Sequence, residues 1–125
     1  MDRVPFTMEF IFRASPAMVY KFLSVPSSII RWFCDECDID GQEYTFIWSG
    51  TPETATLMED DENERLRFQW EDADEGEYLE FRMTKSPVTS ETILEITDYC
   101  DDDEVDDQKA LWEEQIARLK RAAGG

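Results

Sequence analysis

The sequence has no histidine among its 125 residues. Histidine is the side chain that most often exchanges protons near neutral pH, so its absence removes the usual general base and every Ser–His or Cys–His nucleophile. Carboxylates remain as candidate acids and bases, but strand alternation is expected to turn Glu9 and Glu80 outward. We therefore predict no catalytic residue and favour a protein that is not an enzyme.

Basic residues are scarce as well. Twelve lysines and arginines stand against thirty acidic residues, which gives a net charge of −18. Phosphate recognition draws on clustered lysine and arginine, so we predict no binding to nucleic acid. The same charge disfavours anionic membrane surfaces and favours a basic protein partner.

Long apolar runs are missing. No uninterrupted stretch approaches the roughly 18–20 apolar residues that a membrane-spanning helix needs. The first residues also lack the basic start and apolar stretch of a signal peptide. We therefore expect no membrane span and a cytoplasmic protein.

Cysteine is scarce and odd in number, so a complete disulfide framework is not expected. Cys34 and Cys37 have the spacing of a C-x-x-C motif, but they are predicted to enter a strand, where residues three apart face opposite sides. No histidine is present to complete a zinc site with Cys100. We predict no metal site and no cofactor, and the sequence assigns no role to Cys34 and Cys37.

What the chain has is alternation. With 42% apolar and 13% aromatic residues, it can build one core, and its length predicts a single domain over residues 1–125. Apolar residues recur at every second position in most of its segments, as expected for strands with one buried face. The predicted strands span residues 7–13, 36–39, 43–48, 53–58, 65–70, 78–84 and 89–99.

Helices are predicted at two places. Ser15 before Pro16 is typical of a helix start, and a second short helix, capped by Ser27 or Ser28, follows the first. A long helix over residues 104–122 closes the chain, and its apolar stripe consists of Val105, Trp112, Ile116, Leu119 and Ala123. This order predicts an α+β fold: a curved antiparallel sheet of about six to seven strands around the C-terminal helix, with two short helices after strand one.

Several scaffold motifs resemble those of a known family. They are Ala14-Ser15-Pro16, Val19-Tyr20, Trp32-Phe33, Gly41, residues 65–70 and Thr92-Ile93-Leu94. Across nearly the whole length the chain resembles the START-like (helix-grip, SRPBCC) superfamily, and most of all the branch named for the activator of a heat-shock chaperone ATPase. That family includes lipid carriers, hormone receptors, aromatase/cyclases and chaperone activators. The resemblance implies a helix-grip fold with a ligand site between the sheet and the last helix.

Residues on the inward face are the first candidate site. They either line a cavity for an apolar or aromatic ligand or simply fill the core. The predicted cavity residues are Phe10, Phe46, Trp48, Phe68, Trp70, Phe81, Leu94, Trp112 and Ile116.

Acidic loops are the second candidate. Because turns of an up-and-down sheet alternate between its two ends, the loops at residues 71–77 and 101–107 are expected at the same end. The predicted acidic rim consists of Asp72, Asp74, Glu75, Asp101, Asp102 and Asp103. This rim either selects a cationic ligand or basic protein, or is only a solvated surface. Neither loop has the spacing of a calcium-binding EF-hand loop.

Three functions follow in order of preference. The first is non-enzymatic binding of a small apolar or aromatic ligand between the sheet and the C-terminal helix. The second is an acidic protein-interaction module, associated with a chaperone, that binds a basic partner. The third is an enzyme of the aromatase/cyclase type. Ligand identity, oligomeric state and cellular process are not specified by the sequence.

Overall fold

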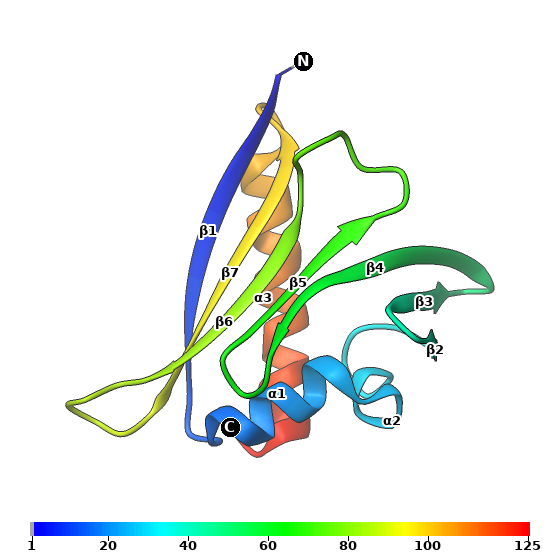
Figure 1. Ribbon diagram of the computed structural model, residues 1–125. Coiled ribbons are helices and arrows are strands. Elements are labelled where there is room, and N and C mark those ends of the chain that lie inside the picture. Colours follow the sequence, from blue (N-terminus) through cyan, green and yellow to red (C-terminus); the bar gives the residue numbers. More distant parts are fainter. Residues whose placement is uncertain (1) are drawn as a thin grey trace.

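The structure is a computed structural model that describes residues 2–125. Within this range one antiparallel sheet of seven strands has the order β1-β7-β6-β5-β4-β3-β2. The strands are β1 (Arg3–Phe12), β2 (Glu36–Asp40), β3 (Glu43–Trp48), β4 (Thr51–Asp61), β5 (Arg65–Trp70), β6 (Leu79–Lys85) and β7 (Thr92–Asp101). The helices are α1 (Pro16–Ser24), α2 (Pro26–Ile29) and α3 (Val105–Ala123). The sheet curves around α3 (Figure 1), so the predicted fold class is confirmed.

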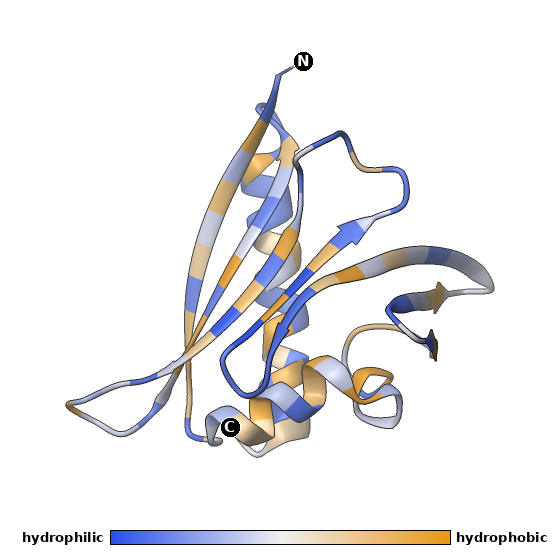
Figure 2. Cartoon of the chain, viewed as in Figure 1, coloured by the Kyte–Doolittle hydropathy of each residue, from blue (hydrophilic) through white to orange (hydrophobic). Residues whose placement is uncertain are grey.

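Alternation along the strands builds the inner face of the sheet. Hydrophobic and hydrophilic residues alternate along β1 and its neighbours (Figure 2). Phe6 and Phe12 of β1 are buried, and the register pairs Phe10 with Leu94 of β7, which is fully buried. The period of two therefore places one apolar row of each strand against the helix.

Glu80 lies on the outer face of the sheet, as the alternation predicts. It is nevertheless only 5% exposed. The guanidinium groups of Arg67, Arg82 and Arg65 lie 3.3, 3.4 and 3.7 Å from its carboxylate. Two arginines from the neighbouring strand β5 and one from β6 itself compensate the charge of this carboxylate, and sequence alternation alone does not reveal such an arrangement.

The two short helices close the lower end of the sheet. The Ser15 hydroxyl accepts a hydrogen bond of 3.2 Å from the Met18 N–H, as expected of an N-cap. Helix α2 starts directly at Pro26 after Val25, with no side-chain cap, so the predicted serine cap is wrong. Proline at the first helical position needs no donor partner, which makes the missing cap tolerable.

Helix α3 packs its apolar stripe against the inner face of the sheet. Trp112, Ile116 and Leu119 are buried along one stripe, as the helical spacing predicts. The helix ends at Gly124, whose φ of 88° suits glycine, and the Arg13 N–H donates to the Gly125 carbonyl. This contact places the C-terminus beside the start of α1 (Figure 1).

The position of α3 is asymmetric. It contacts β1, β7 and α1, whereas α2 contacts β2 at the far edge of the sheet. Aromatic side chains rather than backbone elements line the space between α3 and the β3 side. Among residues 2–125, no helix is long and apolar enough to cross a membrane.

Candidate ligand-binding groove

The interior beneath α3 is nearly filled. A small void of about 20 Å³ remains, lined in part by the predicted cavity residues Phe46, Phe68, Trp70 and Phe81. Such a volume holds about one water molecule. Phe10, Leu94 and Ile116, also predicted to line a cavity, contribute to neither this void nor the groove described next; Leu94 and Ile116 are fully buried packing residues.

An open groove provides far more space. It has a volume of about 890 Å³ and lies where α3, the segment after α2 and the ends of β3 and β5 meet. All four tryptophans of the chain line it: Trp32, Trp48, Trp70 and Trp112. Exposed Ile30 and Leu111 lie at its mouth. Small-molecule sites in proteins are commonly of this size and this aromatic character.

Phe33 connects the tryptophans of the groove. Its ring centroid lies 5.2 Å from that of Trp48, 5.0 Å from Trp32 and 6.3 Å from Trp112, the last in a stacked arrangement. Trp48 in turn lies 6.4 Å from Trp70. Aromatic pairs at such distances stabilise one another, so the groove wall is a preformed cluster.

Hydrogen bonds fix three of the indole rings. The indole N–H of Trp32 donates to the Phe22 carbonyl at 2.8 Å, and that of Trp48 donates to the Phe33 carbonyl at 2.6 Å. The Trp112 indole donates to the Asp98 carboxylate at 3.0 Å. No acceptor for the indole N–H of Trp70 occurs among the residues described, so this donor is available to a ligand.

Asp98 is one of five charged residues at the groove wall, with Arg31, Asp35, Glu53 and Arg118. Its other carboxylate oxygen accepts the Tyr99 N–H at 2.8 Å. Burial raises the pKa of Asp98, although the hydrogen bonds from Tyr99 and Trp112 act in the opposite direction. The ionised carboxylate is therefore held in a place where water solvates it poorly.

A second, acidic cleft adjoins the groove. Its volume is about 420 Å³, and Trp70 and Asp98 line both spaces. The predicted rim residues Asp72 and Asp74 line this cleft. Arg3 lies between the acidic loops, 2.8 Å from Glu77 and 3.3 Å from Asp101, so the structure brings the β5–β6 loop and the end of β7 together.

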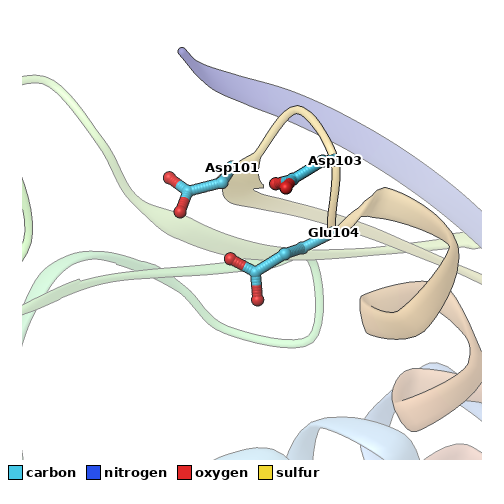
Figure 3. A group of neighbouring side chains, drawn as sticks. All are labelled: Asp101, Asp103 and Glu104. Atoms are coloured by element: carbon cyan, nitrogen blue, oxygen red, sulfur yellow. The ribbon is translucent and has the colours of Figure 1, made fainter. Parts of the chain in front are cut away.

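The remaining rim residues lie on the neighbouring turns. Glu75 is exposed on the β5–β6 loop, and Asp102 is exposed on the turn after β7. Asp101, Asp103 and Glu104 have carboxylate oxygens within 4.8 Å of one another on that turn (Figure 3). Hydrogen bonding with Asp101 raises the pKa of Glu104, which fits like charges held close together.

The cysteines are not activated. Cys34 lines the groove, but burial raises the pKa of its thiol to about 12. Burial also raises the pKa of Cys37 and of Cys100. All three thiols are free and stay protonated at neutral pH, which opposes a nucleophilic or metal-binding role.

Some site residues were not predicted from the sequence. Asp98 is one of them, although a signal for it was present: it follows Leu94 and Ile96 at every second position, which places its carboxylate on the inner face. Phe33 was seen only as part of a scaffold motif, and its role depends on where α3 lies. Nothing in the local sequence marks Arg3 as the bridge between the acidic loops.

Comparison with known proteins identifies the family. A START-like superfamily domain matches residues 1–125, and the chain therefore belongs to the START-like superfamily. No curated protein matches the chain. The solution structure of BfR322 from Bacteroides fragilis is 31% identical, covers 97% of this chain and 91% of that chain, and has a TM-score of 0.70.

Two further structures share the fold at lower identity. The Aha1 dimer from Colwellia psychrerythraea has a TM-score of 0.80 at 18% identity, with 96% of each chain covered. The AHSA1-like protein from Aeromonas hydrophila has a TM-score of 0.78 at 16% identity, with 97% of this chain and 92% of that chain covered. The predicted resemblance to the START-like superfamily is confirmed, and the two Aha1-like structures share its fold.

Proposed function

We propose that this protein binds a small apolar or aromatic molecule, without transforming it, in the groove between α3 and the ends of β3 and β5. The single observation that carries the proposal is the gathering of all four tryptophans around one opening of about 890 Å³. Trp48 and Trp70 are only half-buried and offer ring surface at this opening, whereas Trp32 and Trp112 are buried and support the wall. This arrangement favours recognition of a ligand.

The geometry of the groove supports the proposal in two further ways. Hydrogen bonds orient Trp48 and Trp112 before a ligand arrives, so little side-chain entropy is lost on binding. The Asp98 carboxylate and the indole N–H of Trp70, for which no acceptor occurs within residues 2–125, supply polar contacts beside the tryptophans. Absence of histidine agrees with binding rather than catalysis, because the commonest general base is missing.

Native mass spectrometry tests the proposal. Protein purified gently from cells is expected to retain a small-molecule adduct, and the Leu111→Asp variant is expected to lose it, because a carboxylate is placed at the mouth of the groove. Val88→Asp is the matched control, since Val88 is 89% exposed and does not line the groove. Equal adduct levels in all three proteins, or none in any, would contradict the proposal.

A second candidate function is an acidic protein-interaction module. It is supported by the acidic loops, which lie at one end of the sheet and are connected through Arg3. Binding of this kind weakens as salt is added, whereas burial of an apolar ligand does not. A basic protein captured at low salt and released at high salt, together with a clean mass for the free protein, would favour this second function.

A further inference from the structure

The aromatic groove and the acidic cleft form one continuous surface. They share Trp70 and Asp98, so a ligand that lies on the tryptophans reaches the acidic loop without leaving the wall. The apolar space and the charged space are therefore two parts of one elongated site, each large enough for part of a small molecule.

The cleft end of this site has an excess of negative charge. Four carboxylates and one guanidinium line it, and that guanidinium, on Arg3, is already paired with Glu77 at 2.8 Å. No ion pair within residues 2–125 involves Asp72, Asp74 or Asp98. A cation placed here meets three carboxylates that form no ion pair within residues 2–125, although Arg3 acts on Asp98 from a distance.

The opposite end of the groove carries positive charge that is already engaged. Arg118 lies six residues beyond Trp112, roughly 9 Å farther along α3. Its guanidinium lies 3.4 Å from the Glu114 carboxylate, and that of Arg31 lies 5.2 Å from the centre of the Phe22 ring. Asp35 and Glu53 also line the groove, and Asp98 is the one carboxylate that lines both the groove and the acidic cleft.

We propose that the ligand is a cationic amphiphile: an apolar or aromatic body seated on Trp48, Trp70 and Trp112, with a protonated or quaternary amine at the Asp98 end. This inference rests on the proposed function and adds the charge of the ligand and its orientation. The faces of tryptophan rings attract cations, and the carboxylates of the cleft add a direct charge interaction.

The state of Asp98 agrees with this assignment. Burial raises its pKa, and the indole of Trp112 supplies only a neutral hydrogen bond. An ammonium group next to this carboxylate favours the ionised form and replaces the solvation that burial removed. The same carboxylate opposes an anionic ligand.

The experiment compares three probes that share one aromatic body. Naphthylethylamine is cationic, naphthylethanol is neutral and naphthylpropionate is anionic, and isothermal titration calorimetry at low salt gives their dissociation constants. We expect the amine to bind about five- to twentyfold more tightly than the alcohol, and the acid to bind most weakly. The alcohol measures the groove alone, because it carries no charge.

Two variants locate the charge effect. Asp98→Asn is expected to bring the dissociation constants of the amine and the alcohol close to each other, while the alcohol binds as before. The double variant Asp72→Asn/Asp74→Asn is expected to reduce the preference in part, and it keeps the test informative if Asp98→Asn is poorly folded. Glu113→Gln, on the exposed face of α3, removes the same charge outside the site and is expected to keep the full preference.

Each outcome has one meaning. Equal affinity for amine and alcohol overturns the cationic assignment and leaves the proposed function standing. No binding of any probe overturns the proposed function and the inference with it. If both site variants keep the full preference for the amine over the alcohol, the inference is overturned. It is also overturned if an oligolysine peptide binds while the three probes bind equally well. Either result assigns the acidic residues to another role.

Discussion

Asp98 is a half-buried charge that accepts two hydrogen bonds, and its protonation connects stability to pH. Its pKa is raised in the folded protein by burial. A carboxyl with a raised pKa stabilises the fold below the pKa of the unfolded chain, and this contribution is lost as the pH rises through the folded pKa. Near neutral pH, the ionised Asp98 therefore destabilises the fold, and it places a negative charge at the groove.

We expect the free energy of unfolding of Asp98→Asn, relative to that of the wild type, to rise with pH, because only the wild type places a charge at this half-buried position. Asparagine keeps one of the two acceptor oxygens, so the loss of one hydrogen bond, from Tyr99 or from Trp112, is expected at every pH. Urea unfolding at several pH values measures the difference, with Glu113→Gln to correct for the loss of one negative charge. A difference that does not change with pH, or that falls as the pH rises, would contradict the account.

The Arg3–Glu77 ion pair changes the stability of the fold with pH in the opposite direction. Hydrogen bonds from Arg3 lower the pKa of Glu77, so the pair stabilises the fold above the unfolded pKa and loses this contribution as the pH falls through the lowered one. We expect Arg3→Gln to cost about 1 kcal/mol near neutral pH, because the arginine is partly exposed. Chemical unfolding should show the difference fading in acid.

Arg118→Gln is the matched control for this pair. Arg118 forms an exposed pair with Glu114 within one helix turn, and its loss should cost only about 0.3–0.5 kcal/mol. Equal costs for the two arginine variants would show that the bridge between the acidic loops adds nothing to stability.

At the scale of elements, α3 contributes residues both to the core and to the wall of the groove. Its stripe of Trp112, Ile116 and Leu119 is buried against the sheet, while Leu111 remains 46% exposed at the mouth of the groove. One turn of the helix thus contributes to the core on one side and to the ligand wall on the other. Core packing therefore determines where Trp112 meets Phe33 and Asp98.

We expect Ile116→Ala to destabilise the protein by about 2–4 kcal/mol, because it removes buried methylenes and leaves a cavity. Ile116 is only 1% exposed, and Glu113 lies on the exposed face of the same helix. Thermal and urea unfolding measure the loss, with Glu113→Ala as the control that should stay near wild type. A cost below about 1 kcal/mol would mean that α3 does not pack as described.

The sequence predicted the elements better than their ends. The period of α3 is long and regular, so its predicted start and end agree with the structure to within one residue. Strand β1 starts at Arg3, and the register shift between Leu57 and Glu59 accompanies a longer β4 than predicted. Alternation is weak in such places, and pairing with a neighbouring strand decides where they begin and end.

Less of the site was predictable. Alternation correctly turned Phe46 and Phe68 inward, and both are buried. Whether inward aromatic residues enclose a cavity depends on how closely α3 approaches, and that distance is a property of the assembled fold. The groove opens on the β3 side because α3 packs nearer β1 and β7, and no local pattern carries this information.

At the scale of the whole molecule, charge and aromatic residues are distributed unevenly. The net charge of the protein is −18, and acidic loops at one end of the sheet contribute to it. The four tryptophans meet beside that end. A molecule with this distribution attracts cations over a distance and offers them an apolar surface on arrival. The START-like scaffold holds both parts in fixed positions.

The most direct test of the central claim is nuclear magnetic resonance of the four indole N–H groups during titration with neutral naphthylethanol. The account predicts that the signals of Trp48, Trp70 and Trp112 shift together and saturate, while backbone signals on the outer face around Arg82 stay in place. Indole signals that do not respond, or a saturable response confined to residues outside the groove, would contradict the claim that these tryptophans form a ligand-binding site.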